Sequence, residues 1–151
     1  MTTVTPPPVG LLLDKVARVN AQRFAQRIAD LDITPRHVGL LTAAASQEAP
    51  SQSELGAWLG VGPSTVVAIV DELETRGAVV RSPDLSNRRR MIITVTDEGT
   101  RLLAEATRRA EELDQELFSE LPSELVEVFA TATRLIAVRL GVGGSPADHR
   151  G

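Results

Sequence analysis

The spacing of apolar residues predicts long helices at both ends of the chain. Over residues 9–30, apolar side chains recur every three to five positions, as on one face of an amphipathic helix. A second such stripe begins after residue 96, and Pro122 interrupts it before a last stripe over residues 123–140. Thr34 and Thr96 are suitable N-cap residues, so each is predicted to begin a helix.

The middle of the chain has the residue pattern of a helix-turn-helix over residues 52–71. That motif requires apolar residues at five fixed positions, a small residue where its helices cross and a glycine at its turn. The apolar positions are occupied by Leu55, Leu59, Val61, Val66 and Ile69. Gly56 occupies the crossing position, and Gly60 can adopt the positive φ of the turn. Pro63 suits the first position of the second helix, since its missing N–H is not needed there.

The residues on both sides of this motif complete a winged helix. Ser51 and Glu54 have the spacing of a capping box, which predicts the start of the first helix. After the second helix, residues 78–81 and 91–96 are rich in β-branched side chains and are separated by a turn-forming loop. This loop ends in three adjacent cations, Arg88, Arg89 and Arg90. A helix-turn-helix followed by a hairpin with a basic tip predicts a DNA-binding winged helix.

Several of these segments together resemble the MarR family of bacterial transcription regulators. They are Thr34-Pro35, Ser51-Gln52-Ser53-Glu54-Leu55, Gly60-Val61-Gly62-Pro63-Ser64-Thr65-Val66, Val70-Asp71-Glu72-Leu73-Glu74-Thr75-Arg76-Gly77, the loop from Asp84 to Arg90, and Val95-Thr96-Asp97-Glu98-Gly99. The resemblance covers residues 31–103 by motif and the rest by layout. In that family an Asp usually precedes the arginine pair of the loop. This chain has Asn87 there, which leaves Asp84 as the acid available to orient an arginine.

The resemblance implies a homodimer that represses transcription. Its two recognition helices would lie about one DNA turn, ~34 Å, apart on a pseudo-palindromic operator in double-stranded DNA. It also implies release from DNA by a small aromatic or phenolic ligand bound between the helical arm and the DNA-reading lobe. Phe24 and His37 are the candidate ligand-binding residues, although core packing for Phe24 and a solvent-exposed or core-edge position for His37 are the simpler interpretations.

The predicted fold class is mainly α, with α+β character in the wing. The terminal helices have apolar faces that a winged helix of this size is too small to cover, so they are predicted to form a dimerisation layer. The expected organisation is a flexible arm (1–8), an N-terminal dimerisation helix (9–33), the winged helix-turn-helix lobe (34–96), C-terminal dimerisation helices (97–140) and a flexible tail (141–151).

Charge is unevenly distributed along the chain. The 151 residues have a net charge of −4, yet residues 34–94 contain six cations and six anions, and residues 97–127 contain three cations and ten anions. Between Arg36 and Arg76 there is no Lys or Arg, so the recognition helix has no guanidinium to read guanine. Base readout is therefore expected from hydroxyl groups and from apolar contact with thymine methyl groups. The candidate DNA-binding residues are Ser64, Thr65, Val67, Ala68, Arg76, Arg81, Asp84, Arg88, Arg89 and Arg90.

Other chemistry is not indicated. The chain has no cysteine, its two histidines are far apart in sequence, and no catalytic or metal-ligand spacing occurs, so neither enzyme, metal nor cofactor is expected. No apolar run is long enough for a signal or a membrane span, which predicts a cytoplasmic protein. Trp58 is interpreted as core packing. The alternative function is a winged-helix module of weak or no DNA affinity that binds a protein partner or a ligand.

Overall fold

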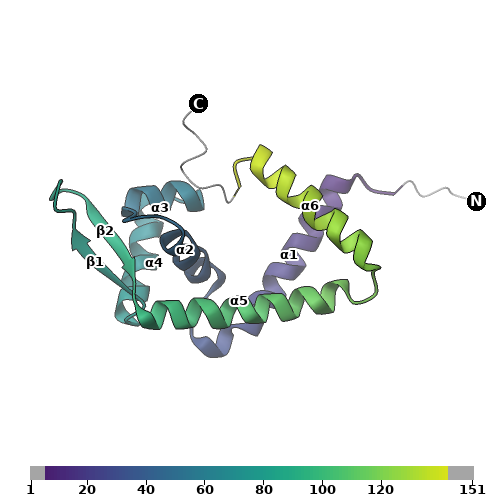
Figure 1. Cartoon of the computed structure of the whole chain (residues 1–151), viewed down its shortest axis with the longest axis horizontal. Coiled ribbons are helices and arrows are strands. Elements are labelled where there is room, and N and C mark those ends of the chain that lie inside the picture. Colours follow the sequence, from purple (N-terminus) through teal and green to yellow (C-terminus); the bar gives the residue numbers. More distant parts are fainter. Residues whose placement is uncertain (1–5, 143–151) are drawn as a thin grey trace, which may run out of the picture.

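The computed structural model describes residues 6–142 and shows a helical lobe with a hairpin, attached to a helical arm (Figure 1). Its elements in chain order are α1 (Val9–Arg27), the 3-10 turn η1 (Ala29–Leu31), α2 (Pro35–Ala45), α3 (Gln52–Leu59), α4 (Pro63–Thr75), β1 (Val79–Pro83), β2 (Met91–Val95), α5 (Asp97–Phe118) and α6 (Ser123–Arg139). In Figure 1, α2, α3, α4 and the hairpin gather at one end of α5, and α6 lies toward the other end. The predicted arm 1–8 and tail 141–151 lie mostly outside the described residues.

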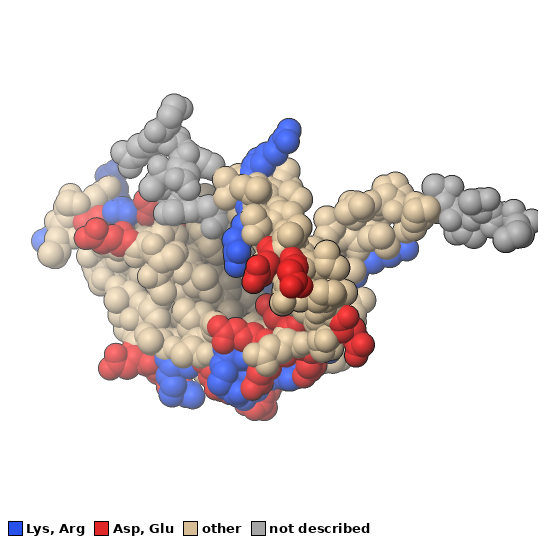
Figure 2. All heavy atoms as spheres, turned by 45° about the vertical axis from the view of Figure 1, so that its right-hand side comes forward, with Lys and Arg blue, Asp and Glu red and all other residues tan. Residues whose placement is uncertain are grey.

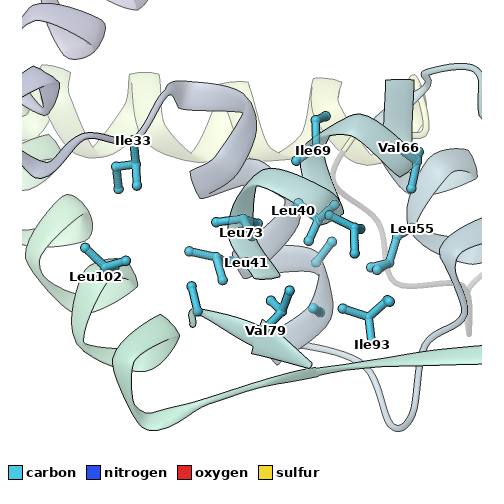
Figure 3. Close-up of a cluster of buried hydrophobic side chains, with 14 of the residues drawn as sticks. Ile33, Leu40, Leu41, Leu55, Val66, Ile69, Leu73, Val79, Ile93 and Leu102 are labelled. Carbon is cyan, nitrogen blue, oxygen red and sulfur yellow. The ribbon is translucent and has the colours of Figure 1, made fainter. Parts of the chain in front are cut away.

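The hydrophobic core lies in the lobe and is built from every element around it. Side chains from α2, α3, α4, both strands and the first turns of α5 converge in Figure 3. Leu40, Leu41, Leu55, Leu73 and Val79 are completely buried. Trp58 packs against this cluster, as predicted. Because α4 contributes one whole apolar face to the core, its opposite face is fixed toward solvent.

The helix-turn-helix has the predicted geometry. α3 and α4 are bent by 110° with respect to each other. At the turn Gly60 has φ +65°, and at the crossing Gly56 is buried so closely that an added Cβ would lie 2.9 Å from a methyl carbon of Val66. The capping box is also confirmed. The Ser51 amide donates to Glu54 Oε2 at 2.7 Å, and the Glu54 amide donates to Ser51 Oγ at 3.2 Å.

The wing is an antiparallel pair in which Arg81 lies opposite Ile93. The strands are joined to the start of α3 as well as to each other, because the Ile93 amide donates to the Pro50 carbonyl at 2.9 Å. A bridge between Ser51 and Ile92 extends this contact. The wing and the helix-turn-helix are therefore one packed unit.

The arm consists of α1, the distal half of α5 and α6. Arg109 on α5 donates to the Arg27 carbonyl at 2.7 Å and pairs with Asp30, which ties α5 to the end of α1. Figure 2 shows charged side chains gathered along the lower edge, where α5 runs, below mainly uncharged surface. Within the described residues, neither α1 nor α6 has a buried residue.

The sequence predicts an N-terminal helix over residues 9–30, and the observed helix is shorter, because α1 ends at Arg27 and the 3-10 turn η1 follows. Thr34 and Thr96 cap α2 and α5 as predicted. In residues 6–142 no single helix is long and apolar enough to cross a membrane, and the one helix pair that meets the length and composition criteria together, α3 with α4, is the bent pair of the helix-turn-helix.

Candidate nucleic-acid interface

The outer face of α4 presents small polar and aliphatic side chains. Ser64, Val67, Ala68 and Asp71 are exposed, and Thr65 is half-buried. Gly62 precedes the helix without a side-chain cap, and Pro63 occupies the first position. This placement agrees with the side chains that the sequence assigns to base contact, and their role in DNA binding stays a prediction.

Arg81 on β1 forms ion pairs with two acids of α4. Its guanidinium pairs with Asp71 and, at 2.8 Å, with Glu74. Its Nε donates to the side-chain oxygen of Gln52 at 2.7 Å. The Arg81 side chain is only 20% exposed, so this cation holds the wing, α3 and α4 together.

The third acid of α4, Glu72, is held by His37. The Thr34 amide donates to His37 Nδ1 at 3.1 Å, so that nitrogen carries no proton and Nε2 is the donor of the neutral imidazole. His37 Nε2 then lies 2.8 Å from Glu72 Oε2. The imidazole is 3% exposed, which rules out the solvent-exposed interpretation of His37. Phe24, the other candidate ligand residue, packs partly buried against the core.

Arg76 is likewise committed within the protein. Its Nε donates to the Asp32 carbonyl at 2.8 Å, and its terminal nitrogen lies 3.1 Å from the Asp32 carboxylate. This contact joins the end of α4 to the turn before α2. The predicted contacts of Arg76 and Arg81 with DNA would therefore require each of them to exchange these partners for phosphate.

Arg90 anchors the wing loop. It lies 2.9 Å from Asp84 and 2.6 Å from Glu54, the acid of the capping box. Hydrogen bonds from Ser86, followed by the contact with Arg90, lower the pKa of Asp84 to about 2. The Ser51 amide, and then Arg90, lower the pKa of Glu54. Asp84 thus orients an arginine, in accord with the prediction made from the absence of Asp at position 87.

Arg88 and Arg89 are the exposed cations at the wing tip. Within residues 6–142 they form no ion pair, unlike Arg90. The Arg89 amide donates to the side-chain oxygen of Asn87 at 3.2 Å, which shapes the loop without using either guanidinium. These two residues therefore carry the charge that the wing can offer to phosphate.

Two hollows flank the outer face of α4. One, of about 530 Å³, lies between α4 and the wing and is lined by Val67, Ala57, Asn87 and Arg89 among others. The other, of about 470 Å³, lies between α4 and the start of α2, where Arg36, His37, Thr65 and Ala68 line it. The outer face of α4, between these two hollows, is the surface that a DNA groove would contact.

The internal partners of these side chains were not predicted. His37 with Glu72, Arg81 with Asp71, and Arg90 with Glu54 each join residues from different elements. Glu54 was recognised as a capping residue from its spacing to Ser51, and nothing local signals its second partner across the wing. The only signal in the sequence for these pairs was that elements predicted to be neighbours carry opposite charges.

The geometry defines a winged helix-turn-helix protein, and comparison with known proteins identifies its family. The MarR family profile matches residues 33–91. A crystal structure of a MarR-family transcriptional regulator from Rhodococcus sp. RHA1 is 32% identical, with TM-score 0.77 over 85% of this chain and 91% of that one. CouR from Rhodococcus jostii RHA1, solved with p-coumaroyl-CoA, is also 32% identical over the same shares, with TM-score 0.71. The chain belongs to the MarR family.

The curated sequence NicR, an HTH-type transcriptional repressor from Pseudomonas putida, is 34% identical over 95 residues. That match covers 63% of this chain and 60% of NicR. MarR of E. coli shares the fold, with TM-score 0.78 at 21% identity over 87% of this chain and 98% of that one.

Proposed function

We propose that the protein is a homodimeric DNA-binding transcription regulator that acts as a repressor in the cytoplasm and has no catalytic role. The observation that carries this proposal is the state of the charges around α4. Arg81 offsets part of the charge of Asp71 and Glu74, and His37 binds the carboxylate of Glu72, while Arg88 and Arg89 are exposed at the wing tip. The contact with Arg81 reduces the repulsion between α4 and the DNA phosphates, and the wing supplies cations to the backbone or the minor groove.

Dimerisation is supported by the uncovered apolar side chains of the arm. On α6, Phe129, Leu135 and Ile136 are 41–67% exposed, and on α1 Val16 and Val19 are 48% and 59% exposed. Large apolar side chains exposed together on a helix are typical of protein–protein contact surfaces. Asn20 Oδ1 is buried without a hydrogen-bond partner among the described residues, beside an apolar hollow of about 260 Å³ between α1 and α5. A second copy would cover this surface.

A ligand-responsive regulator is supported by the hollow beside His37. It separates the start of α2 from α4, and the exposed Arg36 at its edge suits an anionic group. A small aromatic or phenolic acid bound there would disturb the contact between His37 and Glu72 and hence the position of α4. CouR was solved with p-coumaroyl-CoA, whose acyl group is phenolic, and this supports a phenolic ligand here.

The alternative function is a winged-helix module that binds a partner or ligand without DNA. It is favoured by the complete lack of Lys and Arg on α4. A gel shift with the DNA upstream of the protein's own gene, at low and at raised salt, separates the two. Retarded DNA at low salt that is released by salt supports the regulator, whereas no retardation at either salt concentration contradicts it.

A further inference from the structure

The recognition helix lacks every side chain that reads a purine by paired hydrogen bonds. Over Pro63–Thr75 it has no Arg, Lys, Asn, Gln or His. Arg and Lys read guanine, and Asn and Gln read adenine, through two acceptor or donor atoms on one base edge. The hydroxyl groups of Ser64 and Thr65 can bind any base, so they discriminate weakly.

Neighbouring cations do not replace the missing ones on α4. Arg81 contacts α4, but its guanidinium is already bound to Asp71, Glu74 and Gln52. Arg76 is bound to Asp32 at the far end of the helix. Two exposed cations remain as competitors for a base contact within the described residues: Arg36 at the edge of the hollow beside Thr65 and Ala68, and Arg89 in the hollow beside Val67.

An aliphatic surface remains at the centre of the outer face. Val67 is 40% exposed, and Ala68 beside it is also exposed. Ala57 and Pro63 continue this surface along the hollow toward the wing. The thymine methyl group is the apolar group that the major groove presents, so these side chains match thymine.

Asp71 adds selectivity against guanine. It is 56% exposed one turn after Val67 and Ala68, and a carboxylate can accept a hydrogen bond but not donate one. Guanine presents two acceptors in the major groove, so Asp71 disfavours it, whereas the amino groups of cytosine and adenine suit it. Its pairing with Arg81 reduces repulsion from the phosphates.

We propose that α4 reads its operator through thymine methyl groups packed against Val67 and Ala68, without a guanine contact. This inference rests on the proposed function, since it specifies how the DNA is recognised. Val67 is the main specificity-determining residue, because it is the larger of the two exposed aliphatic side chains.

The test uses the full-length protein and a duplex that it binds in the gel shift, shortened to the protected region. Each thymine is replaced in turn by deoxyuridine, which removes the methyl group alone, and each guanine by 7-deazaguanine, which removes the N7 acceptor. We expect at least one deoxyuridine position per half-site to weaken binding about fourfold, the effect of burying one methyl group. We expect 7-deazaguanine to change affinity less than twofold.

Variants locate the contact. Val67→Ala should weaken binding to the thymine duplex and reduce the deoxyuridine effect to less than twofold. Val80→Ala is the matched control, because Val80 is a 47% exposed valine on β1, outside α4, and this variant should retain the full effect.

The outcomes are separable. A duplex that tolerates every deoxyuridine but loses tenfold affinity with 7-deazaguanine overturns the inference and leaves the proposed function intact, with Arg36→Ala and Arg89→Ala identifying the competing cation. A deoxyuridine effect that persists in Val67→Ala overturns the assignment to Val67. Failure to bind any upstream duplex overturns the proposed function, and the inference falls with it.

Discussion

At the scale of single residues, Arg81 limits the negative charge that α4 presents to DNA. Arg81→Ala leaves Asp71 and Glu74 unpaired on the face of the protein that carries the recognition helix, so DNA affinity should fall. The loss of stability should be small, about 1 kcal/mol or less, because both acids are 40% or more exposed. Fluorescence anisotropy with an operator duplex measures the affinity.

Two further variants test this explanation. Adding Asp71→Asn and Glu74→Gln to Arg81→Ala removes the uncompensated acids and should restore part of the affinity. Arg76→Ala, which breaks an ion pair away from the wing, is the control and should weaken binding less. Equal losses in the two arginine variants would show that Arg81 does not act through these acids.

Asp84 provides a pH test at the same scale. Its pKa in the folded protein is about 2, below the ordinary value of 3.8, because Ser86 and Arg90 stabilise its charged form. The stabilisation is therefore complete above pH 3.8 and is lost as the pH falls toward 2. The Ser86 amide, which donates to Asp84 Oδ1 at 2.8 Å, reports this titration by NMR.

The Ser86 amide shift should stay constant from pH 7 to 4 and change at lower pH. In Asp84→Asn the change should disappear. A midpoint near the ordinary value of 3.8 in the intact protein would mean that the contacts of Asp84 in the wing loop are not formed in solution.

At the scale of elements, two glycines set how closely helices approach their neighbours. An added Cβ at Gly99, at the start of α5, would lie 2.1 Å from the Ala78 carbonyl oxygen, whereas at Gly56 it would meet a side-chain methyl at 2.9 Å. Gly56→Ala should therefore lower the free energy of unfolding by about 1–3 kcal/mol, and Gly99→Ala by more than that. Urea denaturation measures both.

Gly62→Ala is the matched control, since no atom lies within 4 Å of its added Cβ and its φ is −70°. It should leave stability nearly unchanged. If Gly99→Ala were as stable as this control, the packing of α5 against the hairpin would be wrong.

The elements themselves were predictable from the sequence because their signals are local. Capping by Ser51 and Thr34, the turn at Gly60 and the apolar periods each depend on residues a few positions apart. The site was less predictable. Arg76, Arg81 and Arg90 were assigned to DNA from their charge, and the structure adds internal partners for all three. A cation pairs with whichever acid the fold brings near, and sequence spacing does not specify that acid.

At the scale of the whole molecule, the exposed apolar faces of α1 and α6 predict a homodimer at micromolar concentration. Deleting residues 123–151 removes one of these faces and should give a monomer in sedimentation velocity. Ile136→Asp, a charge placed on the 49% exposed apolar surface of α6, should weaken dimerisation without removing a helix. A well-folded monomer of the intact chain would contradict the proposed assembly.

The central claim, that the protein binds DNA with the wing supplying the phosphate contacts, is tested most directly by the salt dependence of binding. Each lost phosphate contact lowers the slope of log affinity against log salt by about 0.9. Replacing Arg88 and Arg89 by alanine in both subunits should therefore lower the slope by up to about 3.6, with Arg90 kept to anchor the loop. Anisotropy with an operator and a scrambled duplex over a salt series gives the slopes. If the wild type binds neither duplex at low salt and the double variant behaves identically, the protein is not a DNA-binding regulator.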